Sequence, residues 1–177
     1  PAPHDAGCAI GAALCGIKDK KVDFKSVRSP YLGRNFSNKE IYQELSKECK
    51  INPIRINEDE LIKKTVNYLI DGKLVGWFQG GAEFGPRALG ARSFLADPRN
   101  DKIRDQINQK IKKRELFRPF APSTLKNNFK DFFDISQDSP YMNIVAKVKS
   151  SKIPAVTHID GTARIHTISE KMHKRYF

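Results

Sequence analysis

Apolar residues recur at helical spacing in three parts of the chain, which predicts a helix in each of them: residues 5–17, 61–70 and 100–115. The first of these is rich in Gly and Ala, so we expect a tightly packed helix there. A fourth helix is predicted from Ser37 to about Lys50, because Ser37 and Glu40 have the spacing of a capping box.

Shorter apolar or alternating segments predict strands at residues 74–78, 94–95, 143–148 and 162–168, the first of them buried. Glycines from Gly80 to Gly90 predict a turn after the first strand. Helices and strands alternate from residue 58 onward, so the predicted fold class is α/β, with an α+β mixed sheet. The extended segment Ile51–Pro53 marks a boundary, which gives domains of residues 1–52 and 53–177.

Composition favours a reduced protein that binds polyanions. The 32 Lys and Arg against 20 Asp and Glu give a net charge of +12, which suits nucleotides, phosphates or nucleic acid without choosing among them. Cys8, Cys15 and Cys49 form an odd set without metal-type spacing, and we expect Cys8 and Cys15 to be small core residues. Neither a bilayer-length apolar run nor a signal peptide is visible, so a cytoplasmic protein is predicted.

Two arginines stand where charge needs an explanation. Arg87 follows the glycines of the 80–90 turn, where backbone N–H groups and a guanidinium fork could hold a phosphate, although a tight turn alone also explains the glycines. Arg118 lies between Phe117 and Pro119-Phe120, and a cation held among buried apolar residues needs an anionic partner.

The other candidates are closer to ordinary turn chemistry. Residues 139–142 are interpreted as a turn that enters a strand. Asp160-Gly161 is a strong turn signal, but turn chemistry does not explain Arg164, which follows it on a predicted strand. His158 and His166 could act as bases, yet histidines without a clear partner are more often structural.

Taken together, these motifs resemble the NodU/CmcH-type O-carbamoyltransferase family. The resemblance covers nearly the whole chain in order and spacing, and it is carried by the following segments: 83–90, 92–93, 96–99, 112–122, 139–142 and 155–164, with 5–13 and 29–33 in the early part.

The resemblance implies both the fold and the reaction. Family members pair an actin-like (ASKHA-type) domain with a YrdC-like domain, so residues 1–52 would be the tail of the first domain plus a linker. Residues 53–177 would be the YrdC-like domain, ending short of the family's usual carboxy-terminal segment. That domain activates carbamoyl phosphate with ATP to carbamoyl-adenylate. The carbamoyl group then passes to a hydroxyl of a sugar or antibiotic in the first domain.

The resemblance also implies site residues and cofactors. Lys112 and Arg118 would be catalytic, and Arg87, Lys112, Arg118 and Arg164 would together hold ATP and carbamoyl phosphate. ATP and Mg²⁺ would act here, whereas an iron-type metal would belong to the first domain. Asp5 aligns with one ligand of that metal, but its histidine partners would lie upstream. We therefore expect this chain alone not to complete carbamoyl transfer.

Three other functions remain open at this point. A basic nucleic-acid-binding module would suit the charge, although the aromatic residues cluster with Pro and Gly rather than forming a stacking platform. A threonylcarbamoyl-adenylate synthase of the YrdC type would use threonine and bicarbonate. A non-catalytic fragment would retain the pocket without turnover. His166 stands where the family commonly has glutamine, and its role is undecided.

Overall fold

The computed structural model describes residues 2, 5–17, 29–48 and 51–177, so Cys49 and Lys50 lie outside the described residues. The helical elements are α1 (Asp5–Gly16), α2 (Asn38–Lys47), α3 (Glu58–Ile70), α4 (Ile103–Gln106), the π-helical turn η2 (Ile107–Lys112), α5 (Phe129–Phe132) and the 3-10 turn η3 (Pro154–Val156). The strands are β1 (Val75–Phe78), β2 (Arg92–Leu95), β3 (Ser123–Leu125), β4 (Phe133–Asp134), β5 (Ile144–Val148) and β6 (Thr162–Ile168).

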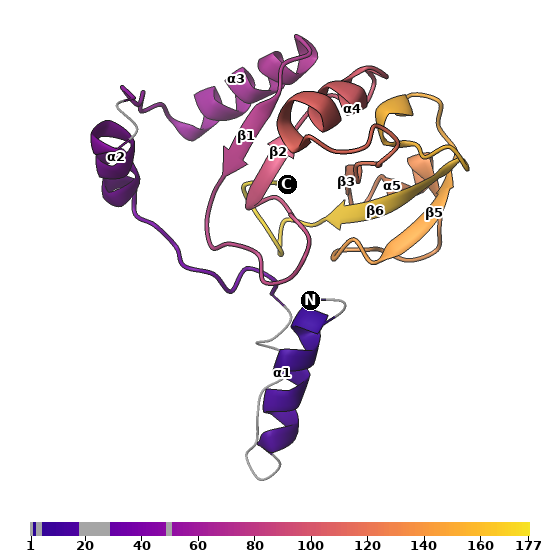
Figure 1. Ribbon diagram of the computed structural model, residues 1–177, viewed down its shortest axis with the longest axis horizontal. Coiled ribbons are helices and arrows are strands. Elements are labelled where there is room, and N and C mark those ends of the chain that lie inside the picture. Colours follow the sequence, from indigo (N-terminus) through magenta and orange to yellow (C-terminus); the bar gives the residue numbers. More distant parts are fainter. Residues whose placement is uncertain (1, 3–4, 18–28, 49–50) are drawn as a thin grey trace.

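The described strands form two sheets, which confirms the predicted α/β class with a mixed sheet (Figure 1). Strands β1 and β2 pair antiparallel in the first sheet. The second has the order β3-β6-β5-β4, in which β3 runs parallel to β6 and the other pairs are antiparallel. Because β6 is central, its side chains meet elements on both sides, and five of its seven residues are buried.

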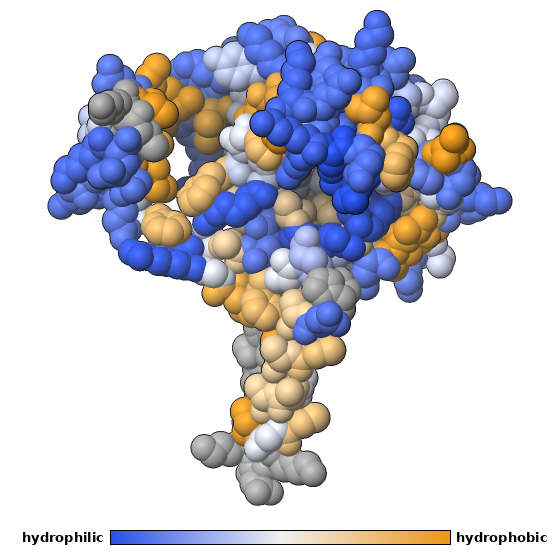
Figure 2. All heavy atoms as spheres, viewed as in Figure 1, coloured by the Kyte–Doolittle hydropathy of each residue, from blue (hydrophilic) through white to orange (hydrophobic). Residues whose placement is uncertain are grey.

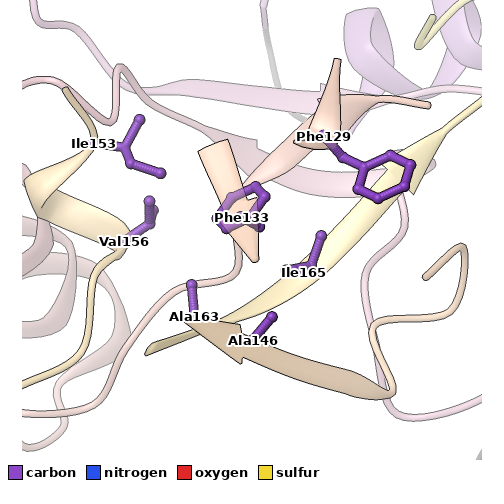
Figure 3. Close-up of a cluster of buried hydrophobic side chains, with 7 residues drawn as sticks. All are labelled: Phe129, Phe133, Ala146, Ile153, Val156, Ala163 and Ile165. Carbon is purple, nitrogen blue, oxygen red and sulfur yellow. The ribbon is translucent and has the colours of Figure 1, made fainter. Parts of the chain in front are cut away.

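The main core lies against the second sheet, where β5 and β6 meet the α5–β4 segment and the loop before η3 (Figure 3). Phe133 and Ile165 are almost completely buried at its centre. The other buried members are Phe129, Ala146, Ile153, Val156 and Ala163. A second, smaller cluster joins α4, η2 and η3 through Ile103, Ile107 and Ala155. Phe120 packs against both clusters and so connects them.

Helix α1 departs from the sequence prediction. It extends away from the sheets, and apolar side chains cover its surface (Figures 1 and 2). None of its residues is buried, and Cys8 and Cys15 are exposed free thiols rather than core residues. The reason is tertiary: the sequence correctly predicts the helix, but no described element lies against its length.

Three other predictions can be compared with the structure. The capping box is confirmed, since Ser37 accepts from Glu40 N–H and the Glu40 carboxylate accepts from Ser37 N–H. The predicted 100–115 helix is shorter and changes to π-helical hydrogen bonding at Ile107. The 74–78 strand is not buried, because β1 pairs only with β2 and leaves Phe78 exposed.

The segment at residues 29–36 packs on the glycine-rich turn. Phe84 N–H donates to the Pro30 carbonyl at 2.6 Å, Gly33 N–H donates to the Ala82 carbonyl at 2.9 Å, and the Tyr31 hydroxyl donates to the Leu89 carbonyl at 2.8 Å. These bonds tie the predicted linker to the 53–177 part of the chain. The division into domains at residue 52 itself stays a prediction.

Within the described residues, no helix has the length and apolar character needed to cross a bilayer. The predicted compartment stays a prediction.

Candidate functional site

A cavity of about 370 Å³ opens between the glycine-rich turn, the η2 turn and strand β6. Its volume is in the range of small-molecule sites. Six of the residues that line it are cationic, and none is Asp or Glu: Arg87, Arg92, Arg104, Lys112, Arg114 and Arg164. Figure 2 shows hydrophilic side chains gathered over α4 and the region below it in that view. A concave site with this charge favours an anionic ligand with several oxygen atoms.

Glu83 shapes the wall that carries Arg87. One of its carboxylate oxygens accepts from the N–H groups of Leu89 and Ala91 at 2.6 and 2.8 Å, and from that of Arg92 at 3.2 Å. A carboxylate that accepts three backbone bonds holds the turn in one shape. Glu83 was not among the residues predicted from the sequence, and its place three residues before Pro86-Arg87 gave no separate signal.

Arg92 lines the cavity but is occupied by the protein itself. Its guanidinium donates to the carbonyls of Gln79, Gly80 and Ala91 at 2.9–3.0 Å and lies 3.5 Å from the centre of the Phe78 ring. Arg104 is also engaged, through an ion pair with Asp105 at 3.0 Å. The carbonyl bonds therefore hold Arg92 in the wall while it keeps its charge, and Asp105 offsets the charge of Arg104.

The η2 turn provides the opposite wall. Lys113 follows it in the left-handed conformation, with a φ of 47°, and reverses the chain so that Lys112 and Arg114 both line the cavity. Asn108 is fully buried behind this reversal and accepts from Arg114 Nε at 2.7 Å. Arg114 and Asn108 were missed by the sequence analysis, because nothing in the spacing indicates a π-helical turn.

Five cavity cations lack an acidic partner among the described residues, and Arg92 is the one of them that carbonyl oxygens hold in the wall: Arg87, Arg92, Lys112, Arg114 and Arg164. The Nε atoms of Arg87 and Arg164 are buried and have no hydrogen-bond partner among the described residues. Burial lowers the pKa of Arg164, and the nearby charges of Arg87 and Arg114 lower it further. Such a cluster is electrostatically unfavourable without an anion, which could accept from all of these groups.

The structure brings three of the four predicted cations together and leaves one apart. Arg87, Lys112 and Arg164 line the cavity, whereas Arg118 lies outside its lining and pairs with Glu115 at 2.8 Å. The expectation that apolar neighbours bury Arg118 is not met, since its side chain is 53% exposed. Asp5 is exposed, and no group of three or more potential metal ligands occurs among the described residues.

His166 lies behind the cavity wall on β6. Its Nδ1 atom is 3.0 Å from the Ser123 hydroxyl, which also accepts from the Tyr176 hydroxyl at 3.2 Å. Ser123 and Tyr176 both line the cavity. The Tyr176 ring packs on Gly90, whose φ of 99° and lack of a side chain permit this approach. His166 therefore supports the wall through Ser123 and is not itself exposed to the cavity.

A pH-dependent stability follows from this burial. Desolvation lowers the pKa of His166 from 6.5 to about 4. In the unfolded state His166 binds a proton below its ordinary pKa of 6.5, whereas the folded state disfavours that proton. The contribution of neutral His166 to the free energy of unfolding is therefore fully present above pH 6.5 and is lost between pH 6.5 and 4. We expect wild type to lose about 2–3 kcal/mol more than His166→Gln over this window in urea unfolding. Equal losses in the two proteins would contradict the assignment of a neutral, buried His166.

A second cavity of about 440 Å³ adjoins the first and shares seven lining residues with it: Phe94, Ala96, Pro98, Ala121, Ser123, Val156 and Tyr176. Its other walls are mainly apolar and come from β2, β3 and the start of β4. The cationic cavity therefore borders apolar space on one side.

The fold and the cavity define an α/β domain with a cavity whose lining, among the described residues, carries six cations and no carboxylate. Residues 66–177 match the family described as "Carbamoyltransferase C-terminus", and this chain belongs to that family. The predicted resemblance to the NodU-type carbamoyltransferases is thus confirmed, including residues outside the matched range through the relatives described next.

Three nodulation proteins illustrate this relationship. The chain is 40% identical to NolO of Bradyrhizobium diazoefficiens and 42% identical to NolNO of Sinorhizobium fredii, over its whole length in both cases. It is 36% identical to nodulation protein U of Rhizobium fredii over 98% of its length. The chain covers 34%, 27% and 29% of these proteins respectively, so it spans about a third of the length of its relatives.

Proposed function

We propose that this chain provides the part of an O-carbamoyltransferase that activates carbamoyl phosphate with ATP to carbamoyl-adenylate. Family membership supports carbamoyl transfer in general. The observation that carries the finer proposal is the group of five cavity cations without acidic partners, two of which, Arg87 and Arg164, have buried Nε atoms without a hydrogen-bond partner among the described residues. The complete protein would then transfer the carbamoyl group to a hydroxyl of a sugar or natural product.

The proposed chemistry needs fixed positive charge. Carbamoyl phosphate and water give carbamate and phosphate, and a carbamate oxygen then bonds to the α-phosphorus of ATP as the bond to pyrophosphate breaks. Negative charge grows on the phosphoryl oxygens during this transfer, and cations already held in place stabilise it. Arg87, Arg164 and Lys112, which all line the cavity, would bind these oxygens.

Mg²⁺ is proposed to enter with ATP, on oxygens of the triphosphate. The described residues contain no group of three or more His, Cys, Asp or Glu side chains that could form a resident site for it. The metal predicted for Asp5 would belong to the first domain of the complete enzyme.

Calorimetric titration tests the proposal. The wild-type chain is titrated with ATP and Mg²⁺, with and without carbamoyl phosphate, and we expect saturable binding of ATP whose affinity changes when carbamoyl phosphate is present. Absence of ATP binding by a chain with a cooperative unfolding transition would contradict the proposal. A response to threonine and bicarbonate in place of carbamoyl phosphate would indicate the threonylcarbamoyl-adenylate reaction. Binding of single-stranded RNA that weakens steeply with salt, without ATP binding, would indicate a nucleic-acid module.

Arg118 provides a separate prediction, because the family resemblance and the geometry differ on its role. Its side chain is half exposed and paired with Glu115 outside the cavity. We therefore expect Arg118→Ala to weaken ATP binding by less than about fivefold, since exposed ion pairs contribute little. A loss in the titration as large as that of an Arg164 substitution would show that the pair with Glu115 opens and that Arg118 reaches the ligand.

A further inference from the structure

Two hydroxyl groups lie where the cationic cavity meets the apolar one. Ser123 and Tyr176 line both cavities, and the Tyr176 hydroxyl donates to Ser123 Oγ at 3.2 Å. Among the described residues that line the cationic cavity, only these two and Ser93 carry an oxygen atom in the side chain. Ser93 Oγ already accepts from Gly90 N–H at 3.1 Å. In a cavity rich in donors, Ser123 and Tyr176 are therefore the side chains best suited to accept a hydrogen bond from a ligand.

His166 sets the direction of the hydrogen bonds in this pair. Its Nδ1 atom lies 3.0 Å from Ser123 Oγ. Burial lowers the pKa of His166 to about 4, so near neutral pH its ring is uncharged and has one acceptor nitrogen. When Nδ1 is that acceptor, Tyr176 donates to Ser123 and Ser123 donates to His166, so each hydroxyl proton has a partner within the protein. Both protons then point away from the ligand, and oxygen lone pairs of both hydroxyl groups remain open to it.

We propose that Ser123 and Tyr176 accept hydrogen bonds from the NH2 group of carbamoyl phosphate, and so determine the preference for a carbamoyl phosphate over an acyl phosphate. The inference rests on the proposed function and adds the residues that select the substrate. A carbamoyl NH2 group only donates, so the cations of the cavity cannot bind it, whereas a hydroxyl oxygen can. A methyl group in its place would leave both oxygens without a partner, which is how a polar site rejects a molecule of the same shape.

The phosphate end of the same molecule would lie at the cations. Ser123 is in register with His166 on β6, and Arg164 stands two residues before His166 on that strand. Residues two apart on a strand share one face and lie roughly 7 Å from each other. This spacing is comparable to the length of a carbamoyl phosphate molecule. The cavity thus offers a cation to the charged end of the substrate and uncharged oxygen atoms to its neutral end.

Two stable analogues test this selectivity in calorimetric titrations at constant pH and ionic strength. Phosphonoacetamide carries an NH2 group where acetonylphosphonate carries a methyl group, and the two probes are otherwise alike. Both have CH2 in place of the bridging oxygen of the acyl phosphate, so neither can transfer its group during the titration. We expect wild type to bind phosphonoacetamide about tenfold or more tightly than acetonylphosphonate, because only the first probe satisfies the hydroxyl oxygens.

Variants then assign the preference to the two hydroxyl groups. Ser123→Ala and Tyr176→Phe each remove one oxygen and should each lower the preference by about threefold or more. The double variant should bind both probes within about twofold, through weaker binding of phosphonoacetamide alone, whereas a purely structural defect would weaken both probes alike. His166→Gln should keep most of the preference, since the amide oxygen can also accept from Ser123. Ser150→Ala is the matched control: Ser150 Oγ accepts from Lys152 N–H at 3.2 Å and lines neither cavity.

The outcomes separate this inference from the proposed function. If wild type binds MgATP and binds both phosphonates equally, the inference is wrong and the proposed function stands. If it binds neither MgATP nor a phosphonate, the proposed function is wrong and the inference falls with it. Binding of MgATP without either phosphonate also overturns the inference. A preference that the double variant retains would show that another group, such as Ser93, accepts from the NH2 group. If the double variant does not fold, the single variants decide by the same comparison of the two probes.

Discussion

Arg164→Met is expected to lose about 2–4 kcal/mol of ATP binding, equivalent to a roughly 30- to 1,000-fold rise in Kd, because it removes a half-buried cation of the cavity. The same substitution is expected to maintain or raise stability without ligand. It removes a half-buried cation whose Nε is buried without a hydrogen-bond partner among the described residues and which the like charges of Arg87 and Arg114 destabilise. Titration calorimetry and thermal unfolding of one sample measure both effects.

Lys147→Met is the matched control for Arg164→Met. Lys147 is exposed on β5, the strand that pairs with β6, and its loss removes one positive charge away from the cavity lining. We expect it to change ATP affinity by less than about threefold. A variant of Arg164 that unfolds at lower temperature and binds ATP normally would contradict a ligand role and show that the arginine is structural.

Phe133→Ala is expected to lower the free energy of unfolding by about 3–5 kcal/mol, because it deletes a buried ring and leaves a cavity. Phe133 is 1% exposed and lies in the core that α5, β4, β5 and β6 share (Figure 3). Urea unfolding measures the loss. This core also holds β6, which carries Arg164. We therefore expect ATP binding to weaken only under conditions in which a fraction of the molecules is unfolded.

Phe117→Ala controls for the same chemical change at an exposed position, since Phe117 is 71% exposed. It should alter the free energy of unfolding by less than about 0.5 kcal/mol. Equal losses at the two positions would mean that the second sheet does not contain the stabilising core.

The local elements that sequence patterns predict well are those with their own signals. Ser37 and Glu40 predicted a capped helix, and the alternation of residues 162–168 predicted β6. Strand β3 and the α5–β4 segment were missed, because three to six residues are too few for a period and their conformation depends on pairing with β6 and β5. The burial of Cys8 and Cys15 was wrong, because an apolar pattern does not say whether a partner surface is present.

The sequence by itself determined the α/β class, the family, the excess of positive charge and three cations of the cavity. The tertiary structure alone decided which charges share one space. Arg114 lines the cavity after a π-helical turn and a left-handed Lys113 redirect the chain, whereas Arg118 lies outside the cavity lining, half exposed and paired with Glu115. Arg114 and Arg118 are close in sequence, but the folded backbone sets a different direction for each side chain, and only one of them lines the cavity. The sequence shows which residues are charged, whereas only the folded backbone determines where each charged side chain points.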